Sequence, residues 1–178
     1  MKLTKIAFLD RDGVINSNHY NKGYIGSLKY FKWVPGAINT IKFLKEKKYK
    51  IVIVSNQSGV ARGFFKIKDV RKIHFFIQKK LKNHDVKIDA FYFCPFHKDG
   101  IIKKFKKNSS LRKPNIGMFR LAQKRWRICK NTSFMIGDQK SDMQFASKAK
   151  IKGYLFNKKN LYKFIKNKIF KKNIVLSS

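Results

Sequence analysis

Short apolar runs alternate along the chain with longer segments whose apolar residues recur every three or four positions. The short runs are typical of buried strands, and the periodic segments are typical of helices that pack through one face. Strands are predicted at residues 5–9, 50–54, 88–93, 133–136 and 153–156. Helices are predicted at residues 35–48, 67–81, 116–126 and 142–148.

This alternation predicts an α/β fold class, in which a mostly parallel central sheet lies between two layers of helices. At 178 residues the chain has the length of one domain, so we expect a single three-layer, Rossmann-like domain over residues 1–178. Ligands of such folds bind outside the carboxyl ends of the strands, and functional residues are expected there. Residues 94–114 have no clear period and predict a long basic loop.

The C-terminal segment 157–178 is basic and amphipathic. Its apolar residues stand at helical spacing among lysines, a pattern found in helices that lie on membrane surfaces and in helices that pack on their own domain. We favour packing on the domain. The apolar positions are Leu161, Phe164, Ile165 and Ile169.

The charge of the chain is strongly positive, because 43 Lys and Arg oppose nine Asp and Glu to give a formal net charge of +34. Such a charge attracts polyanions, anionic lipids and phosphorylated metabolites alike. The lysines are spread from Lys2 to Lys172 and are not gathered in one segment. We therefore interpret most of them as solvated surface and expect any nucleic-acid binding to be non-specific.

Cysteine content and hydropathy bear on the location of the protein. Two cysteines, Cys94 and Cys129, are too few for a disulfide framework, which suits a reducing compartment. Asp10 breaks the first apolar run, and no later stretch approaches the ~18 uninterrupted apolar residues of a membrane span. We expect a cytoplasmic monomer without a membrane span or an obligatory protein partner.

Four of the nine acidic residues fall in two short clusters, each directly after a predicted strand. The clusters are Asp10–Val14, with the sequence DRDGV, and Gly137–Asp142, with the sequence GDQKSD. A polar, turn-rich segment, Ser55–Gly59, follows the second predicted strand. Because the carboxyl ends of parallel strands meet at one edge of a sheet, the carboxylates are expected to lie close enough to share a cation.

Paired carboxylates can divide the work of phosphoester hydrolysis. One attacks the phosphorus, while the other protonates the leaving oxygen and later takes a proton from water. Since carboxylates and phosphoryl groups are both anionic, a hard cation has to offset their repulsion, and Mg²⁺ suits a set of oxygen ligands. Asp138 is the expected third ligand beside Asp10 and Asp12. The simplest alternative is that these aspartates only cap helices and turns.

Four motifs resemble those of the haloacid-dehalogenase-like phosphatases, in that family's order. Asp10–Val14 is similar to the nucleophile motif DxDx[TV], and Ser55 to the small hydroxyl of the second motif. Lys113 is similar to the lysine of the third motif, and Gly137–Asp142 to the GDxxxD of the fourth. The resemblance covers a motif-bearing core of about residues 5–156. It implies a minimal cap, made of the flap loop after the first strand and the loop at 95–114.

Within that family the chain most resembles the D-glycero-D-manno-heptose 1,7-bisphosphate 7-phosphatases, with histidinol-phosphatase domains next. This resemblance implies a place in ADP- or GDP-heptose synthesis for lipopolysaccharide core precursors. Histidinol phosphate and nucleic-acid 3′-phosphates are alternative substrates, and a polyanion-binding protein on a phosphatase scaffold is the alternative from another class. The segments that carry the resemblance are Phe8–Gly13, Gly23–Tyr24, Ser55–Gly63, Cys94–Pro95 and Arg112–Pro114.

The resemblance implies a Mg²⁺-dependent reaction through an aspartyl-phosphate, with Asp10 as the nucleophile and Asp12 as the general acid and base. Mg²⁺ is expected on Asp10, Asp138 and the backbone carbonyl of Asp12. Asp142 is expected to support this site or only to cap its helix. The residues expected to bind the phosphoryl group or the sugar are Arg11, His19, Ser55, Asn56, Gln57, Ser58, Arg62, Arg112 and Lys113.

Many members of this subgroup hold a structural Zn²⁺ in the long loop through Cys-x-His and Cys-x-Cys pairs. Here Cys94 matches the first ligand, but Phe96, Ser109 and Leu111 stand at the other three positions, and His97 is one residue late. We therefore expect no structural zinc and predict that Phe96, Phe105 and Leu111 hold the loop by packing.

The remaining rings are expected to be structural. His74 and His84 are predicted to lie on the surface, and Trp33 and Trp126 are predicted to belong to the core.

Overall fold

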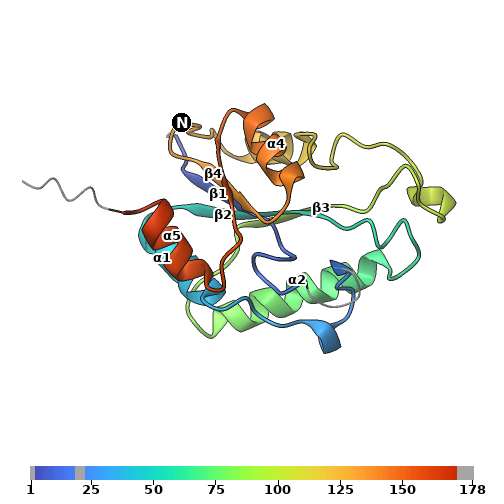
Figure 1. The fold of residues 1–178 in the computed structure, drawn as a ribbon, viewed down its shortest axis with the longest axis horizontal. Helices are drawn as coiled ribbons and strands as arrows, with labels where there is room; N and C mark the ends of the chain where they lie inside the picture. The colour runs from blue at the N-terminus through green and yellow to red at the C-terminus, as the bar shows by residue number, and fades with distance from the viewer. Residues whose placement is uncertain (1–2, 19–22, 172–178) are drawn as a thin grey trace, which may run out of the picture.

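The computed structural model describes residues 3–18 and 23–171, and a five-stranded parallel sheet runs through its centre (Figure 1). The strands are β1 (Ile6–Leu9), β2 (Lys50–Asn56), β3 (Ala90–Cys94), β4 (Phe134–Gly137) and β5 (Lys152–Leu155). Their order is β3-β2-β1-β4-β5, and every neighbouring pair is parallel. The predicted fold class is confirmed.

Helices cover both faces of the sheet (Figure 1). Within the described residues the α-helices are α1 (Ala37–Glu46), α2 (Ile67–Lys82), α3 (Gly117–Arg125), α4 (Lys140–Ala149) and α5 (Leu161–Lys168). Two short 3-10 helices, η2 (Leu28–Tyr30) and η3 (Lys103–Phe105), lie in the connections after β1 and β3. The loop predicted at 94–114 is thus interrupted only by η3.

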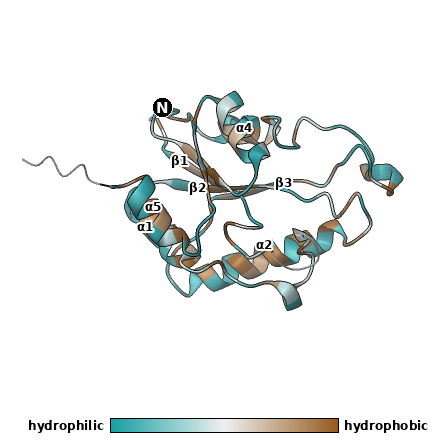
Figure 2. Cartoon of the chain, in the orientation of Figure 1, coloured by the Kyte–Doolittle hydropathy of each residue, from teal (hydrophilic) through white to brown (hydrophobic). Residues whose placement is uncertain are grey.

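Alternate residues of the strands face opposite layers, as the pleat of a strand requires. Ala7 and Leu9 pack into a core with residues of α1, α2 and α5, whereas Ile6 and Phe8 pack with residues of α3 and α4. The helices are apolar toward the sheet and polar outward (Figure 2). These two cores give the predicted three layers.

Most element boundaries differ from the prediction by one or two residues, and two of these differences have local reasons. β3 begins at Ala90, because the Gln78 side chain already holds the backbone of Ile88 through two hydrogen bonds, with N–O distances of 3.0 and 2.9 Å. α4 begins at Lys140, two residues early, since Asp142 accepts a hydrogen bond from the backbone N–H of Gln139 at 3.0 Å and caps the helix from its first turn.

The C-terminal helix α5 packs against α1 on the domain. Leu161, Phe164 and Ile165 are buried in the same core as Ile41 and Leu44 of α1. The apolar side of this helix is therefore covered by the domain, as favoured from the sequence. Of the described helices, none combines the length and the apolar character that crossing a membrane requires.

The prediction that His74 is a surface residue is wrong. His74 is buried on α2, one helical turn after Val70, and its ring stacks on Phe91 at a centroid distance of 4.5 Å and an interplanar angle of 20°. Burial, with a smaller effect of the Arg11 charge, lowers the pKa of His74 to about 3. The exposed His84 is on the surface as predicted, and Trp33 and Trp126 are partly buried against the two cores.

Acid should destabilise the protein through His74. Because its folded pKa lies below the unfolded value of 6.5, the unfolded chain takes up a proton first, and stability is lost as the pH falls from about 6.5 toward 3. Between pH 7 and pH 5 this loss amounts to about 2 kcal/mol. His74→Phe keeps the stack on Phe91 and should remove this loss. Chemical denaturation of the wild type and of His74→Phe at pH 7 and pH 5 measures this loss. The same change in the free energy of unfolding in both proteins would contradict the prediction.

Candidate active site

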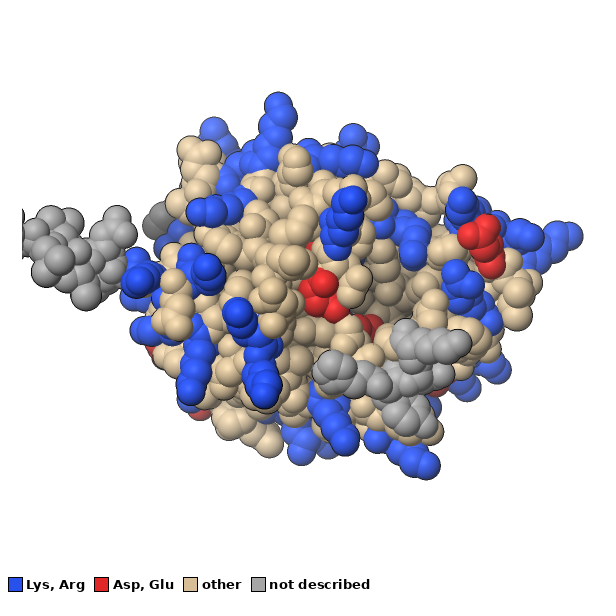
Figure 3. Space-filling view, in the orientation of Figure 1, with Lys and Arg blue, Asp and Glu red and all other residues tan. Residues whose placement is uncertain are grey.

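A polar cleft of about 500 Å³ opens at the carboxyl ends of β1, β2 and β4, the edge where the sequence predicts function. The face in Figure 3 carries Lys and Arg at many separate points, with acidic atoms in a hollow near its centre. The cleft is lined by Asp10, Asp12, Asn18, Gly23, Ser55, Asn56, Ser58, Arg112, Lys113, Asp138, Gln139, Lys140 and Ser141.

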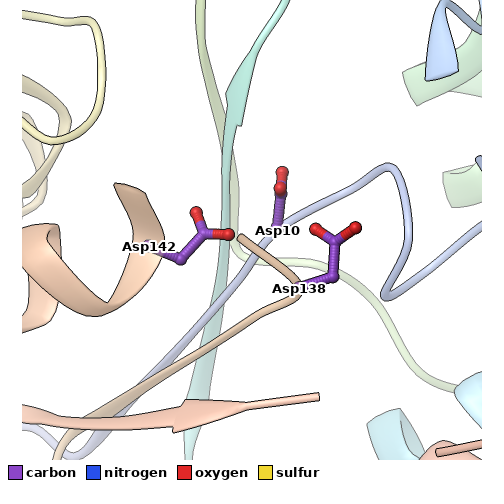
Figure 4. A group of neighbouring side chains, drawn as sticks. All are labelled: Asp10, Asp138 and Asp142. Atoms are coloured by element: carbon purple, nitrogen blue, oxygen red, sulfur yellow. The ribbon is translucent and has the colours of Figure 1, made fainter. Parts of the chain in front are cut away.

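Three carboxylates converge at this edge (Figure 4). Asp10 follows β1, Asp138 follows β4, and Asp142 projects from the first turn of α4. Each offers an oxygen, and these oxygens all lie within 4.8 Å of one another. The two acidic clusters, more than a hundred residues apart in sequence, thus form one group.

Two glycines make this convergence possible. Gly13 has a φ of +89°, and a Cβ at this position would lie 2.3 Å from an oxygen of Asp138. A Cβ at Gly137 would lie 2.2 Å from the side chain of Asp142. Any larger residue at either position would push the carboxylates apart.

Lys113 places a positive charge beside the three carboxylates. Its buried Nζ lies 3.2 Å from Asp10 Oδ1 and 2.6 Å from Asp142 Oδ1, and it donates a hydrogen bond to the carbonyl of Val54 at 2.8 Å. Asn56 anchors the lysine's backbone, since its amide accepts from the N–H and donates to the carbonyl of Lys113, both at 3.0 Å. The long loop is thereby tied to the end of β2.

Burial controls the charge state of the group. It raises the pKa of Asp10 to about 7, although the Lys113 charge acts in the opposite direction, and the neighbouring Asp142 charge raises it further. Burial also raises the pKa of Asp138, against the hydrogen bond from Gln139. Burial alone would lower the pKa of Lys113, but Asp10 and Asp142 raise it. The site holds more negative charge than its lysine neutralises.

Asp12 lies beside this group with both oxygens occupied by donors. Arg11 donates to Oδ1 at 3.0 Å and to Oδ2 at 2.8 Å. The amides of Asn16 and Gln57 donate to Oδ1 at 2.8 Å and to Oδ2 at 2.7 Å. Gln57 also donates to Ser55 Oγ at 2.8 Å, which links Asp12 to the second motif.

The residues fit a divalent cation. Asp138 Oδ2 accepts hydrogen bonds from Asn18 at 2.7 Å and Gln139 at 2.9 Å, but Asp138 Oδ1 is buried and has no hydrogen-bond partner within residues 3–18 and 23–171. A buried carboxylate oxygen without a partner beside two further carboxylates is the donor set that Mg²⁺ prefers. Asp10 and Asp138 would hold the ion, as predicted, and Asp142 lies near enough to support it.

The structure brings most of the predicted site residues to the cleft, but not all. Asp10, Asp12, Ser55, Asn56, Ser58, Arg112, Lys113 and Asp138 line it. Arg11 and Gln57 are buried behind it and contact Asp12 instead. Arg62 also lies outside the lining, with its Nη2 3.4 Å from His97 Nε2. His19 falls outside the described residues.

Three amide side chains that bond the site aspartates were not predicted from the sequence. Asn18 and Gln139 hold Asp138, and Asn16 holds Asp12. Gln139 stands inside the fourth motif and is a candidate for that reason alone. Asn16 and Asn18 lie in an irregular loop with no periodic pattern, so the sequence offers no signal for them.

In the long loop, Phe96 and Phe105 are in contact at a centroid distance of 6.0 Å, and Leu111 packs on the core with α3 and α4. Cys94 Sγ is 3.7 Å from the carbonyl of Phe96. The predicted packing is confirmed, and the expectation that the loop binds no zinc stays a prediction.

Similarity to known proteins shows the family to which this chain belongs. A family model described as polynucleotide kinase 3 phosphatase matches residues 5–155. The D-glycero-β-D-manno-heptose-1,7-bisphosphate 7-phosphatase of Rhodopseudomonas palustris is 39% identical over 160 residues, which cover 90% of this chain and 87% of that protein. The chain belongs to the haloacid-dehalogenase-like phosphatases. Its four motifs indicate the same family.

Further proteins similar to this chain are also haloacid-dehalogenase-like (HAD-like) phosphatases. The protein of the same name from Escherichia coli K12 is 36% identical, with 81% of this chain and 74% of that protein covered. A HAD-like phosphatase from Mesorhizobium loti superimposes with a TM-score of 0.78 at 29% identity, covering 86% of this chain and 72% of that one. The structure of the D,D-heptose 1,7-bisphosphate phosphatase from B. bronchiseptica, complexed with magnesium and phosphate, superimposes with a TM-score of 0.77 at 28% sequence identity. The match covers 92% of this chain and 87% of that one.

Proposed function

We propose that this protein is a Mg²⁺-dependent phosphatase that removes the 7-phosphate of D-glycero-β-D-manno-heptose 1,7-bisphosphate through an aspartyl-phosphate on Asp10. The observation that carries the proposal is the cleft in which Asp10 Oδ1 lies 3.2 Å from Lys113 Nζ, beside Asp12 and Asp138. We infer the substrate from the names of the relatives. Their matches cover most of each relative and most of this chain.

The chain's own residues account for the first half of the reaction. An oxygen of Asp10 attacks the phosphorus while the bond from phosphorus to the sugar oxygen breaks, and Asp12 gives its proton to that oxygen. Ser55 and Lys113 bind the oxygens of the transferring phosphoryl group. Mg²⁺, when bound, supplies positive charge that offsets the repulsion between Asp10 and the phosphoryl group.

The second half regenerates the enzyme. Asp12, now a carboxylate, takes a proton from water as the water oxygen attacks the phosphorus, and the bond between phosphorus and Asp10 breaks. Inorganic phosphate leaves, and Asp10 is restored. Arg112, at the rim of the cleft, is suited to recognise the sugar or its second phosphate.

We also propose that the enzyme works as a cytoplasmic monomer. Both cysteines are free, which suits a reducing compartment, and the large net charge opposes self-association.

A second candidate is a nucleic-acid 3′-phosphatase, favoured by the description of the matching family model and by the charge of +34. Salt separates this candidate from a sugar phosphatase, because binding through many nucleic-acid phosphates weakens steeply with salt concentration.

A phosphate-release assay over heptose 1,7-bisphosphate, histidinol phosphate and a 3′-phosphorylated oligonucleotide tests the proposal. We expect the bisphosphate to have the highest kcat/KM, with release lost in EDTA and restored by Mg²⁺. Exposed Lys124→Met should behave as the wild type. Preference for the oligonucleotide would favour the second candidate, and release that is indifferent to EDTA would contradict the metal dependence.

A further inference from the structure

Arg11 is the largest fully buried side chain of the described protein, and it is not among the residues that line the cleft. Its guanidinium forms a two-point ion pair with Asp12, and the same Nη2 donates to the carbonyl of Ile25 at 2.7 Å. Burying a cation is costly unless its charge is paired, and Asp12 supplies that charge, while Nη1 of Arg11 is buried without a hydrogen-bond partner among the described residues.

Three residues hold the Asp12 carboxyl group through both of its oxygens. Arg11, Asn16 and Gln57 make four hydrogen bonds to these oxygens, and all four come from N–H groups. Both oxygens are therefore arranged as acceptors, as the step in which Asp12 takes a proton from water during hydrolysis of the aspartyl-phosphate requires.

Arg11 is the donor in this set that binds both oxygens of Asp12. A planar guanidinium that bonds a carboxylate at two points fixes the plane of the carboxylate as well as its position, which a single ammonium or amide donor does not. The orientation of Asp12 toward the cleft therefore depends on the Arg11 fork.

We propose that Arg11 is a positioning residue for dephosphorylation: its two-point contact holds the Asp12 carboxylate in the orientation in which Asp12 accepts the proton of the attacking water. This inference rests on the proposed function. It replaces the expectation that Arg11 binds the substrate.

The two half-reactions separate in kinetics when the ester has a good leaving group, such as p-nitrophenyl phosphate. Such a group leaves without a proton from Asp12, and kcat/KM reports only the steps up to phosphorylation of Asp10. Arg11→Lys keeps a positive charge and a donor for the carbonyl of Ile25 but loses the fork. We expect its kcat to fall on the order of 10²-fold, the lower end of general-base effects, with kcat/KM nearly unchanged.

The same variant should release p-nitrophenol in a burst of about one equivalent per active site, because phosphorylated enzyme accumulates. Arg11→Met, which loses the charge as well as the two-point contact, should show a burst of the same size followed by a slower steady-state rate, and the exposed Arg120→Lys should match the wild type. An equal fall of kcat and kcat/KM in Arg11→Lys, or no change in either, would overturn the inference. A wild-type protein without turnover would instead overturn the proposed function.

Discussion

Asp10→Asn is expected to abolish phosphate release while the protein stays folded. Loss of a nucleophile that acts together with its partners lowers kcat by on the order of 10⁴-fold or more. An amide in place of the carboxylate is a poor nucleophile. Of the carboxylates that remain, Asp12 is held by Arg11, Asn16 and Gln57. Asp138 and Asp142 come from other elements and cannot take the position of Asp10 at the end of β1.

The stability of Asp10→Asn separates a chemical defect from a folding defect. Burial raises the folded pKa of Asp10 to about 7, so its ionisation is unfavourable in the folded state, and that cost grows as the pH rises from 3.8 through 7. At pH 8 the neutral amide removes this cost, while Lys113 keeps its contacts with Asp142 and Val54. We therefore expect the variant to melt no lower than the wild type at pH 8.

The matched control is Asp85→Asn. Asp85 is exposed and has a φ of +55°, a conformation that Asn also tolerates, so activity and melting should both stay at the wild-type level. Retained turnover in Asp10→Asn would refute the assignment of the nucleophile. A collapse of its melting temperature would show that Asp10 is needed for the fold.

Lys113→Met is expected to cause the largest loss of stability among the site variants. The substitution leaves Asp10 and Asp142 buried without their cation, and breaking a buried ion pair by removing one partner costs about 3–5 kcal/mol. The same change removes the cation that we propose binds the phosphoryl oxygens, so catalysis should fall with it.

The pH dependence of the stability loss in Lys113→Met shows whether the missing charge causes it. The two carboxylates can escape the penalty by taking up protons, so the loss should be larger at pH 8 than at pH 5. Adding Asp142→Asn to Lys113→Met should recover part of the stability, whereas Lys124→Met on the exposed side of α3 should change nothing. Chemical denaturation of these variants provides the measurement. A loss that is the same at both pH values would mean that the lysine stem, and not its charge, stabilises the site.

The sequence predicts the fold well because its elements depend on local patterns. The run Lys50–Val54 is continuous and β-branched, as a strand buried on both faces requires, and the structure places it second from the edge of the sheet. The acidic clusters at the ends of β1 and β4 follow from the same pattern, since parallel strands bring their carboxyl ends together.

The contacts behind the cleft could not be predicted in this way. Arg11 lies inside the nucleophile-like motif, where a cation suggests a substrate contact, yet its side chain bonds Asp12 and the carbonyl of Ile25, fourteen residues later. The spacing does place His74 on the apolar face of α2, one turn after Val70 and three residues before Ile77, but its residue type favours the surface and its stacking partner Phe91 comes from β3. The contacts of Arg11 and the ring stack of His74 both depend on tertiary packing.

The residue that carries the phosphoryl group decides whether the reaction passes through an aspartyl-phosphate on Asp10. Asp12→Asn, mixed with radiolabelled p-nitrophenyl phosphate and Mg²⁺, should trap phosphorylated enzyme, because this variant lacks the base that we propose activates water. After acid quench and proteolysis, we expect the label on the peptide that contains Asp10, and its loss on treatment with hydroxylamine. Label on another residue, or turnover without a labelled protein, would refute the proposed aspartyl-phosphate.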